Sequence, residues 1–175
     1  KGTYPMYFTS NHDENSWNGT EYERLGDAVK TMAVLTFTAP GIPLIYSGQE
    51  AGLNRRLAFF EKDEIDWNDL TMQEFYKDLI TLKKENPALW NGEYGGQLKI
   101  FETSNKSILA FERSKDGNKV ITIINLSAEA CSADITIGDA AGEYRSFFTQ
   151  EVFNLSNKLM LDLEPWEYIV LTFDS

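Results

Sequence analysis

The sequence predicts two structural classes in succession, an α/β segment over residues 1–90 and an antiparallel all-β segment over residues 91–175. Three observations support this division. Before Leu89, apolar residues recur at helical spacing around two short apolar runs. After Leu89, apolar and polar residues alternate with a period of two. Gly92, Gly95 and Gly96 lie between the two patterns and mark the boundary.

The first predicted element is a buried strand over the aromatic-rich residues 4–9. Asn11, His12 and Asp13 follow it, and His12 is the single histidine of the chain. Open α/β sheets and barrels place their chemistry at the carboxyl ends of parallel strands. We therefore expect a functional site here, although a structural His–Asp pair is the alternative.

A helix and a second strand are predicted next. Residues 20–23, Thr-Glu-Tyr-Glu, form a capping box that predicts a helix start. The helical spacing continues until Pro40, which cannot extend a helix. Residues 42–46 are a short apolar run, typical of a strand buried on both faces of a parallel sheet. Gln49 and Glu50 close this run and are expected on the same side as His12.

A long loop over residues 51–68 precedes the last predicted helix. Loops of this length in compact domains are often functional. Residues 71–74 form a second capping box, and Asn86-Pro87 ends the helix. The apolar face of this helix consists of Met72, Phe75, Tyr76, Leu79 and Ile80, together with the stem of Lys83. The order strand, helix, strand, helix predicts a β-α-β unit with a further helix.

Seven short alternating runs predict an antiparallel β-sandwich. Turn residues separate the runs, and Lys115-Asp116-Gly117-Asn118 predicts a tight hairpin. The predicted strands are Leu98–Glu102, Ile108–Arg113, Val120–Leu126, Ser132–Ile137, Tyr144–Phe148, Lys158–Leu163 and Trp166–Phe173.

Charge and composition exclude some partners. The 175 residues include 27 Asp and Glu against 16 Lys and Arg, for a net charge of −11. This opposes nucleic acid and anionic membranes as partners, whereas a neutral polymer is indifferent to it. No apolar run approaches the roughly 18 residues of a membrane span. Cys131 is alone, which excludes an intrachain disulfide, and is expected to be buried. The compartment stays open among cytoplasm, periplasm and exterior.

Three stretches resemble a known family. Residues 8–13, an aromatic strand ending in Asn-His-Asp, resemble the strand-seven motif of the α-amylase family of glycoside hydrolases. Residues 40–50 resemble the family's strand-eight motif, and residues 163–171 its last sandwich strand. The resemblance covers almost the whole chain. It implies a partial (β/α)8 TIM barrel, formed by the last two β/α units, followed by a C-terminal β-sandwich domain. We therefore expect a piece of a longer protein.

The resemblance also implies an activity. Family members cleave α-1,4 bonds of starch-like glucans with retention, using two carboxyl groups as nucleophile and general acid. Both come from earlier barrel strands that this chain lacks, so we expect the chain alone to be inactive. Asp13 corresponds to the third family carboxylate, a transition-state stabiliser that binds sugar hydroxyls. His12 is expected to hydrogen-bond the same sugar.

The remaining site residues have two interpretations each. Asn11 and Arg55 are assigned to substrate binding, with capping of the strand end and a solvated charge as the respective alternatives. Gln49 and Glu50 are assigned a supporting hydrogen-bonding role. Four aromatic residues are candidates for stacking on sugar rings or for ordinary packing: Trp17, Phe59, Phe60 and Trp67.

No metal or cofactor is predicted for this chain, and calcium stays open for the full-length parent. The expected partners are an α-glucan substrate and either the rest of the barrel or further copies of the fragment, since two barrel units leave both edges of a parallel sheet unpaired. An alternative function is a non-catalytic carbohydrate-binding or structural sandwich module. Its candidate contacts are Tyr94, Tyr144, Phe147 and Phe148. A third, a non-catalytic family relative, is disfavoured by the intact Asn-His-Asp motif.

Overall fold

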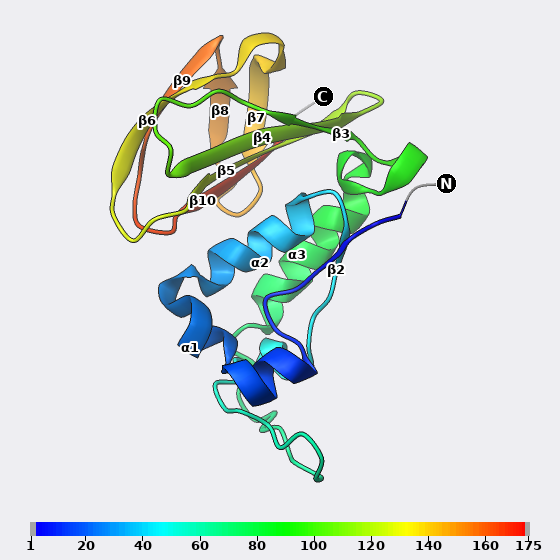
Figure 1. Cartoon of the computed structure of the whole chain (residues 1–175). Coiled ribbons are helices and arrows are strands. Elements are labelled where there is room, and N and C mark those ends of the chain that lie inside the picture. Colours follow the sequence, from blue (N-terminus) through cyan, green and yellow to red (C-terminus); the bar gives the residue numbers. More distant parts are fainter. Residues whose placement is uncertain (1–2, 174–175) are drawn as a thin grey trace.

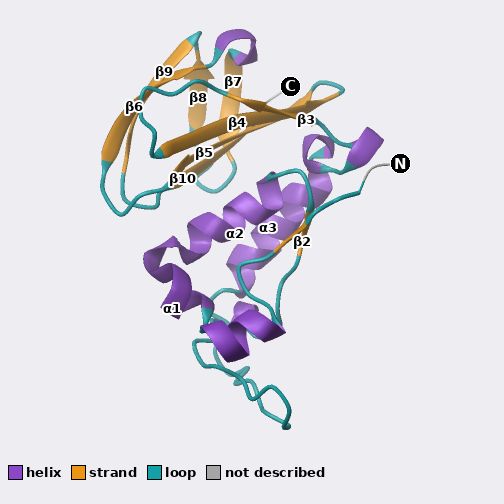
Figure 2. Cartoon of the chain, viewed as in Figure 1, coloured by secondary structure: helices purple, strands orange, loops and turns teal. Residues whose placement is uncertain are grey.

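The computed structural model describes residues 3–173. Within them an antiparallel β-sandwich lies against a layer of helices, and two short parallel strands run beside those helices (Figures 1 and 2). The layers follow the order of the chain, with the α/β segment first and the sandwich second.

The α/β segment contains the predicted order of elements. β1 (Met6–Tyr7) pairs in parallel with β2 (Ile42–Pro43), with Met6 opposite Ile42. Between them lie α1 (Glu21–Leu25) and α2 (Val29–Thr38). α3 (Gln73–Glu85) follows β2 after the long loop. The predicted sequence of strand, helix, strand and helix is therefore confirmed.

The two parallel strands are shorter and more exposed than predicted. Buried strands were expected over residues 4–9 and 42–46, but Met6 is 55% exposed and Ile42 is 48% exposed. Ile80, predicted on the packed face of α3, is also exposed. Parallel strands are buried when neighbouring strands and helices cover both faces. Within residues 3–173, β1 and β2 have only each other as neighbours.

The two predicted capping boxes have different outcomes. The first is confirmed, because the Glu23 N–H donates to Thr20 Oγ1 at 3.1 Å and the Thr20 N–H donates to Glu23 Oε2 at 2.7 Å. The second is wrong, because the N-cap of α3 is Met72, which makes no side-chain cap bond. The Met72 N–H donates to the carbonyl of Glu50 at 3.1 Å. A tertiary contact, and not Thr71, therefore accompanies this helix start.

The antiparallel sandwich predicted for the second half is confirmed. A six-stranded sheet has the order β3-β4-β5-β10-β7-β8, and β6 pairs with β9 in a second sheet. β8 was not predicted. The strands are β3 (Gln97–Ile100), β4 (Ile108–Lys115), β5 (Asn118–Asn125), β6 (Cys131–Thr136), β7 (Gly142–Ser146), β8 (Val152–Leu155), β9 (Lys158–Leu163) and β10 (Tyr168–Phe173).

The six-stranded sheet contributes to two apolar cores. Ile121 and Leu171 belong to the core inside the sandwich, together with residues of β6 and β9. Val120 and Val170, one position earlier on the same strands, belong to the core formed with α2 and α3. Successive side chains of a strand point to opposite faces, so the central strands are covered on both sides. The proposed boundary at residues 90 and 91 thus lies between two segments that share a core.

A buried cation, Arg113, and a half-buried one, Lys83, lie where the helices meet the sheet. Arg113 on β4 donates to five backbone carbonyls, including those of Thr38 and Ala39 at the end of α2. Lys83 Nζ donates to the carbonyls of Phe37 and Leu89 at 3.2 and 2.9 Å. Cations at helix C-termini interact favourably with the unpaired carbonyls there. Burial nevertheless lowers the pKa of Arg113 to about 10.

Candidate functional site

The candidate site follows β1, where the chain enters a short helical turn (Glu14–Asn18) at the end of the helical layer away from the sandwich (Figure 1). His12 Nε2 lies 3.6 Å from Asp13 Oδ2. Their side chains are 67% and 60% exposed, so neither is sealed in apolar packing. The carboxylate and the imidazole are both available to a ligand from solvent.

Asn11 holds the turn that carries these two residues. Its Oδ1 accepts a hydrogen bond from the Glu14 N–H at 2.8 Å, and its carbonyl accepts from the Asn15 N–H at 2.9 Å. Asn11 thus holds the loop by capping the start of the helical turn, and does not cap the strand end. The Asn11 side chain is therefore engaged with the backbone, and a role in substrate binding stays a prediction.

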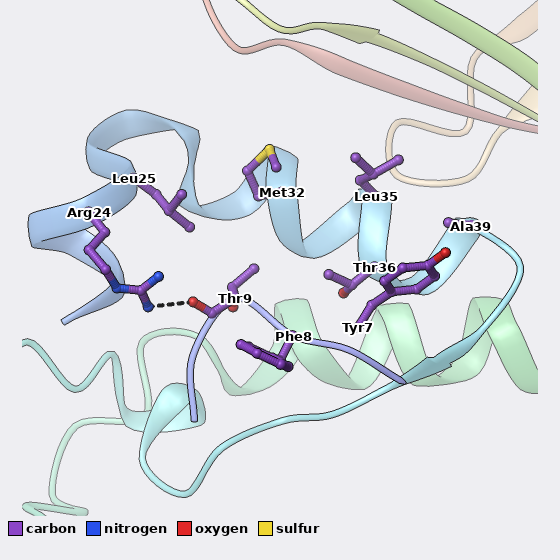
Figure 3. A pocket seen from close by; sticks show the side chains of 9 residues that line it. All are labelled: Tyr7, Phe8, Thr9, Arg24, Leu25, Met32, Leu35, Thr36 and Ala39. Carbon is purple, nitrogen blue, oxygen red and sulfur yellow. Dashed lines mark hydrogen bonds between the residues drawn. The ribbon is translucent and has the colours of Figure 1, made fainter. Parts of the chain in front are cut away.

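Thr9 anchors the strand end immediately before the site. Its Oγ1 donates to Glu21 Oε2 at 2.8 Å, and its carbonyl accepts from Arg24 Nη2 at 2.6 Å (Figure 3). The two partners come from α1, so both the side chain and the backbone of Thr9 are tied to that helix. These bonds restrict the orientation of the turn that presents His12 and Asp13.

Gln49 connects the second strand end to the same place. Its buried Nε2 lies 2.8 Å from Thr9 Oγ1, 2.6 Å from Glu21 Oε2 and 2.8 Å from Tyr76 Oη. Its Oε1 accepts from the Tyr46 N–H at 2.7 Å. The supporting role assigned to Gln49 is consistent with this network, and the contribution to function is untested.

Sequence reasoning missed Glu21 and Tyr76 as members of this network. Glu21 had been placed only in the capping box, and Tyr76 only on an apolar helix face. The sequence did contain one signal for Glu21. It lies two residues before Glu23, which completes the capping box, and the helical positions after it face inward. Both side chains are buried, and only the fold brings them to Gln49.

The interior behind the site is acidic and desolvated. Burial raises the pKa of Glu21, against the opposing hydrogen bonds from Thr9 and Gln49. Burial and the charge of Glu21 also raise the pKa of Tyr76. Glu21 Oε1 and Glu50 Oε2 are buried without a hydrogen-bond partner in the described part of the chain. Glu50 is the other predicted supporting residue. One of its carboxylate oxygens thus has an unused hydrogen-bonding capacity that a further donor would satisfy.

Arg55 forms an ion pair within the long loop. Its Nη1 and Nη2 donate to the two carboxylate oxygens of Asp63 at 2.8 and 2.9 Å. This bidentate pair holds the pKa of Asp63 well below its usual range. A neighbouring pair joins Arg56 to Glu23 at 2.9 and 3.1 Å. The substrate contact predicted for Arg55 therefore competes with an existing ion pair.

An apolar cleft of about 410 Å³ lies beside the site but does not contain it. Residues 7–9 line one wall, and side chains from α1 and α2, including Leu25 and Leu35, line the other (Figure 3). His12 and Asp13 are not among its lining residues. The cleft thus lies between the end of β1 and the helices α1 and α2.

Other sequence predictions can be placed in the described residues. Among residues 3–173, no three His, Cys, Asp or Glu side chains gather as a metal ion would require. No helix in the same range combines the length and apolar character needed to cross a membrane. Cys131, expected to be buried, is only half-buried at the edge of the sandwich core.

The alternative sugar-binding surface on the sandwich does not form as predicted. Tyr144 is fully buried, and its hydroxyl donates to the carbonyl of Ala140 at 2.8 Å. Phe147 and Phe148 pack against the helical core. Of the four proposed contacts only Tyr94 stands exposed. The alternation of apolar and polar residues did not indicate which aromatic rings the core formed with α2 and α3 would cover.

Comparisons with known proteins agree with the fold. Residues 98–170 match the family described as the C-terminal domain of maltogenic amylase. The α-amylase MalA of Haloarcula japonica is 28% identical over 80% of this chain and 21% of its own length. The structure of a noncanonic maltogenic α-amylase, AmyB from Thermotoga neapolitana, superposes with a TM-score of 0.78 at 15% identity, covering 96% of this chain and 40% of that one. AmyP in complex with maltose gives 0.68 at 18% identity, over 97% and 40%.

These likenesses define an α/β segment joined to an antiparallel sandwich, as found in α-amylase structures. Residues 98–170 are similar to the C-terminal domain of maltogenic amylase, and most of the chain is similar to part of α-amylases. The chain spans about a fifth of the length of the curated relative from Haloarcula.

Proposed function

We propose that this chain is part of an α-amylase-like retaining glycoside hydrolase that cleaves α-1,4-glucosidic bonds in starch-like glucans. The observation that carries the proposal is the exposed pair of His12 and Asp13, 3.6 Å apart, at the end of a parallel strand. Buried hydrogen bonds from Thr9 to Glu21 and Gln49 hold the end of this strand in place. The relatives named α-amylase and the maltose complex of AmyP support a glucan as the ligand.

The two exposed side chains suit a sugar ring. An ionised Asp13 carboxylate accepts hydrogen bonds from two hydroxyls at once, and the His12 imidazole donates one more. Glycoside hydrolysis passes through an oxocarbenium-like transition state, in which bonds to ring hydroxyls tighten as charge develops. A fixed carboxylate beside that charge stabilises it without reorganisation. Asp13 is thus assigned to transition-state stabilisation and His12 to substrate binding.

Residues 1–90 represent the last two β/α units of a (β/α)8 barrel in this proposal. The parallel pairing of β1 with β2, and the helices that follow each strand, support it. The nucleophile and the general acid then come from the part of the parent that precedes this chain. Negligible hydrolysis is expected from the chain alone.

The test uses the longer parent protein beside the isolated chain, both assayed on soluble starch. Asp13→Asn in the parent is expected to lower kcat by roughly 10²–10³, because it removes one preorganised transition-state contact. Asp116→Asn, in an exposed hairpin turn, is the matched control and should retain full activity. Turnover by the isolated chain, or an unchanged kcat in Asp13→Asn, contradicts the proposal.

The rest of the barrel is the proposed partner of the exposed α/β surface. Met6 and Ile42 on the two strands, and Ile80 on α3, form apolar surface that neighbouring barrel units would cover. The isolated chain should therefore self-associate. Sedimentation velocity over a concentration series measures this, and a monodisperse monomer throughout is the contrary result.

A further inference from the structure

One helix holds both ends of the segment that carries His12 and Asp13. The segment runs from Thr9 to Glu14, and the helix is α1. Arg24 of α1 donates through Nη2 to the carbonyl of Thr9 at 2.6 Å (Figure 3). Arg24 Nη1 also lies 3.9 Å from Glu14 Oε2. A single guanidinium therefore contacts the residue at each end of the segment.

A second residue of α1 holds the side chain of Thr9. Glu21 is 2% exposed, and its Oε2 accepts a hydrogen bond from Thr9 Oγ1 at 2.8 Å. Gln49 Nε2, from the turn after β2, donates to the same oxygen at 2.6 Å. One carboxylate oxygen thus joins the segments that follow both parallel strands. These two bonds are buried within residues 3–173, so they do not depend on surfaces that the rest of a longer protein would cover.

The residues between Thr9 and Asp13 have little freedom to absorb a displacement of Thr9. Ser10 is 2% exposed, so close packing surrounds it. The Asn11 side chain accepts from the Glu14 N–H at 2.8 Å and so closes the turn around Asp13. Because closely packed groups transmit strain, a displacement of Thr9 reaches the Asp13 carboxylate.

Stability alone does not account for a carboxylate at position 21. Within residues 3–173 no cation lies at ion-pair distance from Glu21, and its Oε1 has no hydrogen-bond partner. A buried charge without a counter-charge is destabilising, and burial accordingly raises the pKa of Glu21. An uncharged residue would avoid this penalty. Proteins depart from such rules mainly at functional sites, so the carboxylate of Glu21 points to a role in function.

We propose that Glu21 and Arg24 are positioning residues, which touch no substrate and hold the Asp13 carboxylate at the place where the transition state forms. This rests on the proposed function for the role of Asp13. A misplacement of about 1 Å in a reacting site can lower the rate by roughly 10². Contacts that strengthen only in the transition state act on kcat. Loss of either positioning residue should therefore lower kcat more than it raises KM.

A double-mutant cycle in the longer parent protein tests this role. The kcat on soluble starch is measured for wild type, Asp13→Asn, Glu21→Met and the double variant. Glu21→Met should lower kcat by roughly 10–10² in the wild-type background. Because Glu21 acts through Asp13, the same change should lower kcat by less than about twofold once Asp13 is replaced. A merely structural loss would lower kcat by one common factor in both backgrounds.

Conservative variants and a matched control complete the design. Glu21→Gln should restore the wild-type kcat, because its amide oxygen accepts the same two hydrogen bonds. Arg24→Met should lower kcat as Glu21→Met does, and Arg24→Lys should recover only part of it, since an ammonium lacks the planar fork of a guanidinium. Glu112, a carboxylate 6% exposed on β4 of the sandwich, is the control, and Glu112→Met should keep the wild-type kcat. Far-UV circular dichroism establishes that each variant is folded.

A measurement without substrate separates this proposal from the proposed function. His12 is the single histidine, so its imidazole gives one identifiable NMR signal in the 175-residue chain. Glu21→Met should shift that signal, because the turn that carries His12 moves, whereas Glu112→Met should not.

Each contrary outcome is distinct. An unchanged kcat in Glu21→Met and Arg24→Met, or a fall by one common factor in both backgrounds, overturns the positioning role and leaves the proposed function standing. An unshifted His12 signal in Glu21→Met also counts against the positioning role. An unchanged kcat in Asp13→Asn overturns the proposed function, and a shifted His12 signal would then still support the hold of α1 on the turn.

Discussion

Replacing Arg113 with methionine is expected to lower the free energy of unfolding by about 4 kcal/mol. Arg113 is 1% exposed at the junction between the helices and the six-stranded sheet. Within residues 3–173, no carboxylate lies at ion-pair distance from it. Its guanidinium donates instead to the carbonyls of Thr38, Ala39, Leu89, Trp90 and Gly96.

Two opposing terms set this magnitude. Burial lowers the pKa of Arg113 from 12.5 to about 10, so the charged form carries a penalty of about 3 kcal/mol that methionine would remove. Leu89 keeps a second donor, Lys83 Nζ, at 2.9 Å. The other four carbonyls lose the guanidinium; that of Thr38 is buried, and those of Ala39, Trp90 and Gly96 are part-buried. A buried carbonyl left without a donor costs about 1–3 kcal/mol. The carbonyl cost exceeds the recovered penalty by several kcal/mol.

Urea unfolding followed by far-UV circular dichroism measures the change. Arg113→Lys should fall between wild type and Arg113→Met, because one ammonium cannot reach carbonyls on both sides of the guanidinium. Lys158→Met, at an exposed position of β9, is the control for loss of a positive charge and should change stability by less than about 0.5 kcal/mol. An Arg113→Met variant within about 1 kcal/mol of wild type would refute the reasoning, since the carbonyls would then be satisfied without Arg113.

Substitutions at three further positions have defined outcomes. Burial lowers the pKa of Lys83 from 10.5 to about 8. The wild-type chain should therefore gain stability as pH rises from about 8 to 10.5, because the unfolded chain binds more protons in this range. Lys83→Met should lack this gain when urea unfolding is measured at both pH values. The raised pKa of Glu21 acts in the opposite sense: its contribution is complete below the ordinary value of 4.5 and is lost as pH rises. Glu21→Gln should therefore gain stability relative to wild type as pH rises above 4.5, and a difference that does not change with pH would contradict this. Thr20→Ala should cost about 1–2 kcal/mol through loss of the capping box, while Thr20→Ser should restore most of it.

Several local structures were predictable because only a few neighbouring residues form them. The capping box of Thr20 and Glu23 closes within four residues. In the hairpin between β4 and β5, Asp116 and Gly117 have φ values of 48° and 89°, as the Asp-Gly pair predicts for a turn with two left-handed residues. Such signals need no knowledge of the remaining chain.

Features that depend on distant partners were missed or misplaced. β8 (Val152–Leu155) has four residues without alternation, and it exists as a strand because β7 pairs with it. The second capping box did not form where Met72 bonds to Glu50. The cluster behind the site joins residues 12, 28 and 27 positions apart, which no local pattern encodes.

By itself the sequence determined the class of each half, the hairpin, the first helix start and the adjacency of His12 and Asp13. These follow from periodicity and hydrogen bonds that act over a few residues. Only the tertiary structure decided that Glu21, Gln49 and Tyr76 hold the strand end, because the burial and partners of a polar side chain depend on what lies opposite it in space. The same reason explains the exposed parallel strands, because a parallel strand is buried only when neighbours cover it, and within residues 3–173 β1 and β2 pair only with each other.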